Sequence, residues 1–390
     1  MRICHVTSHL PPEQGASALL PVHLADWARD AGDEPTFLAH PPRMISATDG
    51  AQPAGRFAGP VVWVPDRHPG DPDARPVALS PINRARHIWR LARPAIAAAD
   101  IVHTHSNGLL PSLAAWIARR MRKPVVLTLY GTEIWHYAPK RFRPDLFTAA
   151  YRSAARVTFY SAGLLDRALD HGLSREGLSV VYPPVADYFV RADQTERAAA
   201  RQKLGLTERH LLLNVKRLHP LAGQRYLIEA MPAVLRAFPD TRLVFCGTGP
   251  LRAELMALAA HLGVGSNVTF AGLVDNRTVA SYFAAADLFV LPSQLEACPT
   301  VAVEALACGT PVVSTDSPGG VELGRLFGDD VRVVAREHPA ALAEAICAML
   351  RDQRRTLPTT DEVLTREFRP STVAARFSAL YRDVLVPRRP

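Results

Sequence analysis

The sequence predicts an α/β protein made of two doubly wound, Rossmann-like domains. Its 390 residues exceed one ordinary hydrophobic core and fit two domains of roughly 150–200 residues. Short apolar runs typical of buried parallel strands alternate with segments of helical periodicity. The alternation breaks at Tyr182-Pro183-Pro184 and the charged stretch 191–203, which we interpret as the crossing between residues 1–187 and 188–370.

The composition is that of a globular enzyme. Hydrophobic residues make up 48% and charged residues 21%, and no apolar run approaches the ~18–20 residues that span a membrane. The N-terminus lacks the apolar core of a signal peptide. Five cysteines without a CxxC pair indicate a cytoplasmic protein with neither a disulfide framework nor a zinc site. The formal charge of +8 permits an anionic substrate, a membrane surface or nucleic acid, and selects none.

The first half alternates strands and helices. A strand at 3–7 and a proline turn containing Gly15 precede a helix over about 17–31. Residues 41–80, rich in Pro, Gly, Asp and Arg, predict a long irregular connection around the apolar run at 61–64. The pattern predicts further strands at 36–39, 101–105, 125–129, 156–161 and 178–182, and helices at 82–98 and 109–121.

The second half repeats this rhythm. Strands are predicted at 211–217, 242–247, 267–272, 288–293 and 311–315, with a helix after each of the first four. The last helix, over 372–386, has apolar residues on one face at Val373, Phe377, Leu380 and Val384. Two such domains place a cleft at the carboxyl ends of both sheets.

The stretch 288–320 predicts a strand, a polar loop, a helix and a second strand. Glu296 lies in the loop, Thr300 is expected to cap the helix with its hydroxyl, and Gly309 to end it in a left-handed conformation. Glu304 lies two helical turns beyond Glu296 and faces the same side. Because a helix N-terminus attracts phosphate and carboxylates accept bonds from sugar hydroxyls, the stretch suits a sugar attached to a phosphate.

Seven segments together resemble the nucleotide-sugar glycosyltransferases of family 4, which have the GT-B fold. They are HLPPEQGA, DIVHTHSNG, LTLYGTEIW, NVKRLHPLAG, LVFCGTGPL, NVTFAGLV and the stretch from LPSQLEACPT to TDSPGG. The resemblance implies an acceptor-binding domain at 1–187, completed by a C-terminal helix at 371–390, and a donor-binding domain at 188–370. It also implies a retaining, metal-independent transfer without a cofactor, with a UDP-sugar favoured over a GDP-sugar as co-substrate.

The resemblance assigns roles to individual residues. Glu296 matches the acid that contacts sugar hydroxyls, Glu304 the acid on the ribose, and Arg217 the cation that neutralises the leaving phosphate. Since Pro299 lacks an N–H, the backbone donors expected after Glu296 belong to Cys298, Thr300 and Val301. The remaining matches are Gly15, Gly247 and Gly249 beside the phosphates or nucleotide, and Leu273 and Val274 along the base.

Two positions depart from the family pattern. Ala222 stands where a lysine usually precedes Gly223; Lys216 or Arg225 would have to supply that charge, although Lys216 should face away from Arg217. Tyr130 stands where the family often has histidine. Its ordinary pKa of about 10 makes it a poor base, so the leaving phosphate would take the acceptor's proton. The acceptor is expected near Gly15, His105 and Tyr130.

Other side chains have competing interpretations. His103 and His105 face the same way and could bind a metal, but without a third ligand in view we favour a polar strand end. Cys298 and Cys308 are expected to be packing thiols. Basic residues recur at 86, 90 and 93, at 119, 120, 122 and 123, and at 140, 141 and 143, which indicates either a solvated face or a membrane-docking surface, with Pro94 interrupting the first helix.

We therefore predict a retaining glycosyltransferase that acts on a small polar acceptor in secondary-metabolite or cofactor biosynthesis. One alternative is a membrane-surface enzyme with a lipid acceptor. Others are a sugar phosphorylase, a nucleotide-sugar epimerase, or a catalytically weakened protein that only binds nucleotide sugar. Nucleic acid is not an expected partner, and the oligomeric state stays open.

Overall fold

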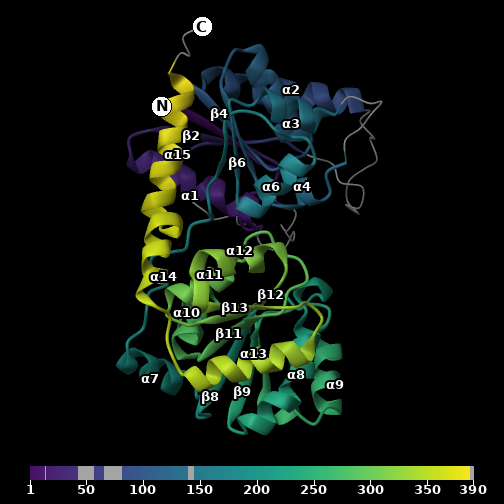
Figure 1. Cartoon of the computed structure of the whole chain (residues 1–390). Coiled ribbons are helices and arrows are strands. Elements are labelled where there is room, and N and C mark those ends of the chain that lie inside the picture. The colour runs from purple at the N-terminus through teal and green to yellow at the C-terminus, as the bar shows by residue number, and fades with distance from the viewer. Residues whose placement is uncertain (14, 43–56, 66–80, 139–144, 387–390) are drawn as a thin grey trace, which may run out of the picture. The chain divides into compact units, whose positions relative to one another are not determined.

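The computed structural model describes residues 1–13, 15–42, 57–65, 81–138 and 145–386. This part of the chain forms two compact units, each with one parallel sheet and covering helices (Figure 1). Unit 1 runs from Met1 to Pro183 and resumes at Val373, whereas unit 2 runs from Pro184 to Thr372.

Unit 1 has a seven-stranded sheet in the order β3-β2-β1-β4-β5-β6-β7. The chain adds strands outward from β1 and then crosses to β4, so the strand order reverses between these two neighbours. The strands are β1 (Arg2–Val6), β2 (Glu34–Ala39), β3 (Val61–Trp63), β4 (Ile101–His105), β5 (Val125–Leu129), β6 (Arg156–Phe159) and β7 (Leu178–Val180). The helices are α1 (Ala16–Asp30), α2 (Pro81–Ala98), α3 (Leu109–Arg120), α4 (Thr132–Trp135), α5 (Leu146–Ser153), α6 (Ala162–Asp170) and α15 (Pro370–Leu385).

Two predictions in unit 1 were wrong. The apolar run in the supposed irregular connection is β3, which pairs with β2 at the sheet edge; the rest of that connection, 43–56 and 66–80, lies outside the described residues. Pro94 does not interrupt α2, which continues to Ala98. Because Pro94 is exposed, water can replace the helical donor that the proline ring removes.

Unit 2 has a six-stranded sheet in the order β10-β9-β8-β11-β12-β13, which reverses between β8 and β11. The strands are β8 (His210–Val215), β9 (Thr241–Cys246), β10 (Val268–Gly272), β11 (Leu288–Leu291), β12 (Val312–Thr315) and β13 (Val331–Val334). The helices are α7 (Gln194–Lys203), α8 (Gln224–Ala237), α9 (Arg252–His261), α10 (Asn276–Ala285), α11 (Thr300–Ala307), α12 (Pro318–Phe327), α13 (Pro339–Asp352) and α14 (Pro358–Val363). The five predicted strands are confirmed, and β13 was missed.

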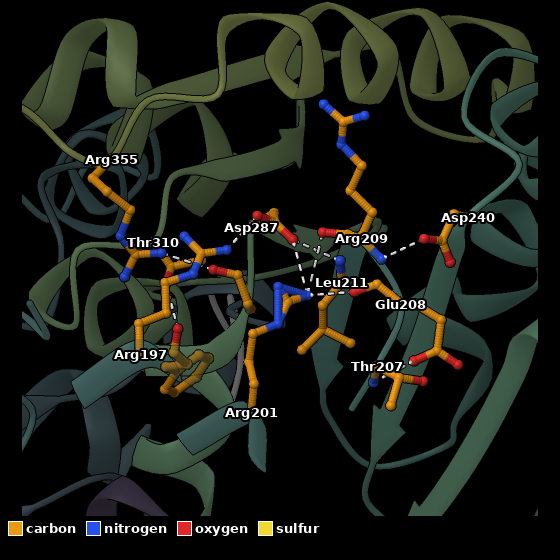
Figure 2. Close-up of polar contacts among 12 residues, drawn as sticks. Arg197, Arg201, Thr207, Glu208, Arg209, Leu211, Asp240, Asp287, Thr310 and Arg355 are labelled. Carbon is orange, nitrogen blue, oxygen red and sulfur yellow. Dashed lines mark hydrogen bonds and ion pairs between the residues drawn. The ribbon is translucent and has the colours of Figure 1, made fainter. Parts of the chain in front are cut away.

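The charged stretch 191–203 is not a linker. Most of it forms α7, whose N-terminus carries a capping box between Asp193 and Glu196. Arg197 and Arg201 of this helix both form ion pairs with Asp287, the residue before β11, and Asp287 also accepts the Leu211 N–H at 2.7 Å (Figure 2). These contacts fix α7 to the amino edge of the sheet in unit 2.

Replacing Asp287 tests this anchor. We expect Asp287→Asn to lower the free energy of unfolding by roughly 2–4 kcal/mol, because two largely buried arginines lose their counter-charge. Urea denaturation followed by circular dichroism measures the change. The matched control is Asp316→Asn, because Asp316 pairs with Arg336 while both side chains are nearly half exposed; it should cost less than about 1 kcal/mol. Equal losses in the two variants would refute the anchoring role.

Candidate active site

The candidate site in unit 2 lies at the carboxyl edge of its sheet, where the strand order reverses. Lys216 and Arg217 directly follow β8, and Glu296 lies in the loop after β11, the neighbouring strand. In doubly wound sheets this reversal opens a crevice in which ligands bind. The topology therefore brings together residues that are 79 and 80 positions apart in the sequence.

Lys216 and Glu296 form an ion pair, so the Lys216 side chain points toward the loop after β11 rather than away from this edge. The Arg217 side chain is exposed and has no acceptor among the described residues. Arg225, the other residue considered as a replacement for the lysine absent at Ala222, is held by Glu229 on its own helix at 3.1 Å. Of Lys216, Arg217 and Arg225, Arg217 is thus the one without a carboxylate partner among the described residues.

Glu304 lies on α11 and is largely buried. Burial raises the pKa of its carboxyl group to about 7. No hydrogen bond to this side chain occurs within the described chain, so the penalty of burying its charge is not offset. Hydrogen bonds from the hydroxyl groups of a ligand would stabilise the charged form of this carboxylate.

The N-terminus of α11 differs from the prediction. Pro299 occupies the N-cap position and no side chain caps the helix, so Thr300 is the first helical residue instead of its cap. The Thr300 N–H already donates to the Cys298 carbonyl at 3.0 Å. In the described part of the chain, the N–H groups of Cys298 and Val301 have no acceptor and remain available. The predicted left-handed Gly309 is confirmed, with φ of 83°.

Cysteine chemistry contributes nothing here. Burial, together with the nearby Glu322 and Glu296 carboxylates, raises the pKa of the Cys298 thiol well above its usual value. Burial raises that of Cys308 to about 12. Both thiols therefore stay protonated and unreactive near neutral pH.

Two glycines let the loops of this edge touch. A Cβ on Gly223 would lie 1.9 Å from the Pro292 carbonyl oxygen, and one on Gly247 would lie 2.2 Å from that of Lys216. Both residues also have positive φ, at 67° and 143°. Gly249 is similarly close to Leu218. These contacts within the protein require the glycines of the Gly-Thr-Gly turn, and a nucleotide contact there remains a prediction.

The other predicted donor residues lie apart from these contacts. Leu273, just after β10, is 78% exposed, and Val274 is partly exposed. Gly15, in unit 1, precedes α1 with φ of 131°, and a Cβ there would meet nothing within 4 Å. The N-terminus of α1 has no side-chain cap, which leaves open space beside free backbone donors.

The strand reversal in unit 1 holds a buried histidine cluster. His105 donates or accepts at both ring nitrogens: Nδ1 lies 2.7 Å from the Tyr130 hydroxyl, and Nε2 lies 3.2 Å from Nδ1 of His5. The His103 ring lies against that of His105, tilted by 33°, with ring centroids 4.0 Å apart. The sequence interpretation named His103 and His105 but missed His5, which pairs directly with His103 because β1 and β4 are neighbours.

His5 supplies the third nitrogen that a metal site would need, and the three ligand atoms lie within 4.8 Å of one another. However, His103 is already bonded through both nitrogens, to Tyr381 and to Thr128, each at 2.7 Å. His105 is also fully bonded. Metal binding would break these contacts, so the described geometry is that of a hydrogen-bonded network.

The network is uncharged near neutral pH. Burial lowers the pKa of His5 to about 3 and moves that of His105 well below its usual value. Burial also raises the pKa of Tyr130 well above 10. None of these groups can take and hold a proton from an acceptor at neutral pH, in agreement with the weak-base interpretation of Tyr130.

Family models match both units. The model for "Glycosyl transferases group 1" matches residues 196–362, and that for "Glycosyltransferase Family 4" matches residues 21–187. Among solved structures, Anabaena HepE in complex with UDP is similar over 98% of this chain and 100% of its own, with a TM-score of 0.76 and 18% identity. That likeness establishes the GT-B fold.

Three curated relatives are similar in sequence. A GDP-mannose-dependent phosphatidylinositol monomannoside mannosyltransferase of Mycolicibacterium smegmatis is 32% identical over 61% of this chain, and the match spans 64% of the relative, less than two thirds. TuaC of Bacillus subtilis, named for teichuronic acid biosynthesis, is 32% identical over 72% of this chain and 67% of its own length. The N-acetyl-α-D-glucosaminyl L-malate synthase of Bacillus anthracis is 25% identical over 73% and 75%.

The raised pKa of Glu304 predicts a pH-dependent stability. Between about pH 4.5 and pH 7 the folded protein keeps a proton that the unfolded chain releases, so this group lowers stability as pH rises. We expect the melting temperature of Glu304→Gln to exceed that of the parent protein more at pH 8 than at pH 5. The exposed Glu344→Gln should follow the parent protein at both pH values. An unchanged difference between the parent protein and Glu304→Gln would contradict the burial argument.

Two glycine substitutions distinguish the cost of steric overlap from the cost of a left-handed backbone conformation. Gly223 and Gly205 have nearly the same φ, 67° and 64°, but only Gly223 meets a carbonyl oxygen at 1.9 Å. Gly205→Ala should cost only the left-handed penalty of about 1 kcal/mol. Gly223→Ala should cost several times more or prevent folding of unit 2. Similar urea midpoints for the two variants would show that the loops can separate freely.

Proposed function

The chain belongs to glycosyltransferase family 4, and from this we propose that it transfers a sugar from a nucleoside diphosphate sugar to an acceptor hydroxyl. The observation that carries the proposal is the composition of the carboxyl edge in unit 2. It combines Arg217 and backbone donors at the start of α11, which have no acceptor among the described residues, with the carboxylates of Glu296 and Glu304. A diphosphate, a sugar and a ribose need these three kinds of partner.

In this proposal the reaction retains the anomeric configuration and uses no metal. The bond between the sugar's anomeric carbon and the diphosphate oxygen breaks, and a bond to the acceptor oxygen forms on the same face. Arg217 and the helix donors stabilise the negative charge that develops on the departing diphosphate. The acceptor's proton passes to that diphosphate, since neither Tyr130 nor His105 can hold it.

Glu296 would hold the sugar hydroxyls, with Lys216 fixing the orientation of its carboxylate. Because the ion pair occupies part of the carboxylate, the remaining lone pairs are presented in one direction. Glu304 would accept the ribose hydroxyls, and Leu273 and Val274 would border the base. Acceptor recognition falls to unit 1, around Gly15 and Tyr130.

For the donor we favour a UDP-sugar over a GDP-sugar. One HepE structure is a complex with UDP-glucose, whereas the name of the mycobacterial relative indicates GDP-mannose for that enzyme. For the acceptor we favour a small polar molecule of secondary-metabolite or cofactor biosynthesis in the cytoplasm. The name of the malate synthase relative supports a small acid as one acceptor class. A thermal-shift panel of UDP-, GDP-, dTDP- and ADP-sugars identifies the donor, since a bound ligand raises stability by RT ln(1 + [L]/Kd).

A lipid acceptor at a membrane surface is the second candidate. Arg86, Arg90 and Arg93 are exposed on α2. The neighbouring α3 exposes Trp116, which lies 5.3 Å from Trp89 and under Arg120. Arginines beside interfacial tryptophans suit an anionic bilayer. None of the helices in the described chain is long and apolar enough to cross a membrane. Co-sedimentation with anionic and neutral vesicles separates this candidate from a soluble-acceptor enzyme.

The proposal predicts separate effects for two neighbouring arginines. Arg217→Ala should lower kcat by at least about 10²-fold, because the leaving group loses its counter-charge. Arg225→Ala, eight residues away and paired with Glu229, should stay within about twofold. Release of nucleoside diphosphate in the presence of acceptor is the measurement, with circular dichroism to verify folding.

Glu296→Ala should also lose at least about 10²-fold in kcat. Near-normal rates in both Glu296→Ala and Arg217→Ala would overturn the site assignment. Product formation from a sugar 1-phosphate, or donor isomerisation without acceptor, would indicate a phosphorylase or an epimerase instead. Donor binding without turnover on any acceptor would indicate a binding protein.

A further inference from the structure

The buried network in unit 1 contains two separate hydrogen-bond chains that begin on neighbouring side chains. The first, here called the His5 chain, runs from His5 through His105 to the Tyr130 hydroxyl. The second, the His103 chain, runs from the Tyr381 hydroxyl through His103 to Thr128 and Thr158. The strand β4, labelled in Figure 1, carries two of the histidines and is the middle strand in the sheet order of unit 1. All three imidazoles are fully buried.

At one end of the His5 chain, the last nitrogen has no hydrogen-bond partner among the described residues. Nε2 of His5 is buried and has no hydrogen-bond partner in the described part of the protein. By contrast, the His103 chain ends in hydroxyl groups, which can donate or accept. Only the His5 chain therefore has an end whose chemistry constrains the direction of its protons.

Each neutral imidazole carries one N–H and one bare nitrogen, so the His5 chain has two possible directions. In the inward direction, Tyr130 donates to His105, His105 donates to His5, and Nε2 of His5 is a buried N–H without an acceptor. In the outward direction, His5 donates to His105, His105 donates to Tyr130, and Nε2 of His5 is a buried lone pair. Among backbone groups, orphaned buried N–H donors are rarer than under-satisfied acceptors, and we apply the same preference to the imidazole, which favours the outward direction.

We propose that His5 is a positioning residue that fixes the polarity of the Tyr130 hydroxyl. With Nδ1–H donated to His105, Nδ1–H of His105 must donate to the Tyr130 oxygen. The Tyr130 proton is then available for an oxygen atom of the substrate. Tyr130 thus recognises a ligand oxygen that accepts a hydrogen bond, such as a sugar hydroxyl, a ring oxygen or a phosphate oxygen. The substrate part of this inference depends on the proposed glycosyl transfer, whereas the direction of the chain does not.

The tautomers can be measured without activity. We expect ¹⁵N NMR of histidine-labelled protein at neutral pH to show His5 and His105 protonated at Nδ1 and unprotonated at Nε2. Single His→Asn variants assign the signals. Protonation of His105 at Nε2 would overturn the proposal, whatever the enzyme's substrate is. Because this measurement needs no substrate, its outcome is independent of whether the proposed function is correct.

Kinetics test the consequence for Tyr130. Tyr130→Phe and His5→Leu should each lower kcat/KM about tenfold, the value of one oriented hydrogen bond, and the double variant should lose no more than either single one. His5→Asn should restore most of the rate, because its amide N–H can occupy the place of Nδ1–H. Additive losses, or no rescue by asparagine, would overturn the proposal.

The matched control is His103→Asn, which changes an equally buried imidazole in the His103 hydrogen-bond chain. It should lower the melting temperature, as His5→Leu does, but leave the dependence of the rate on Tyr130 unchanged. A His103→Asn protein in which Tyr130→Phe no longer lowers kcat/KM would show that general loss of packing, and not the polarity of the His5 chain, disables Tyr130. If His5→Leu does not fold, the NMR result and His5→Asn still decide the question.

Discussion

Contact between backbones at the carboxyl edge of the sheet in unit 2 is the constraint on which the candidate site depends. The loop after β8 touches the loop after β11 at Gly223 and Pro292, and the turn after β9 touches it from the other side at Gly247 and Lys216. Any side chain at either glycine would occupy the position of a carbonyl oxygen. These contacts hold the backbone of Lys216 and Arg217 at a set distance from the Glu296 loop. This distance does not depend on the rotamers of the side chains. The chemistry of the site is therefore positioned by main chain, which is more rigid than an arrangement of long side chains.

The two edges of this sheet differ in whether their charged side chains have partners within the protein. At the amino edge, Asp287 is saturated by Arg197, Arg201 and a backbone N–H, and Arg355 donates to two carbonyl groups at 2.7 Å (Figure 2). Every one of these charges has a structural partner, and the cluster stabilises α7. At the carboxyl edge, the described residues offer no hydrogen-bond or ion-pair partner to the largely buried Glu304 or to the exposed Arg217. Burying the Glu304 carboxyl group without a partner costs stability, which a protein tolerates mainly where a ligand completes the contacts. The exposed Arg217 is hydrated and carries no such cost.

Sequence patterns predicted the elements that have a local apolar pattern. They missed the elements and contacts that depend on residues distant in the sequence. Apolar runs located the strands of unit 2 to within a few residues, but β13, which alternates with the exposed Arg332, was too short and mixed to detect. The segment of α7 has no buried residue and therefore no helical apolar stripe. Arg217 was recognised only as part of a family motif, whereas Glu296 was first noticed from its place in the loop before a predicted helix and then matched to the family. His5 was invisible because only the sheet order, which places β1 beside β4, reveals that it touches His105.

The reversal points of the two sheets share one topology but differ in their electrostatics. Unit 2 presents Arg217, Glu304 and the Lys216–Glu296 pair, whereas unit 1 presents neutral imidazoles whose burial keeps them from ionising. An anion that departs needs fixed positive charge, and a neutral hydroxyl that attacks needs only oriented hydrogen bonds. In the proposed transfer, the charged groups of unit 2 would therefore suit the departing diphosphate, and the uncharged polar groups of unit 1 would suit the acceptor hydroxyl.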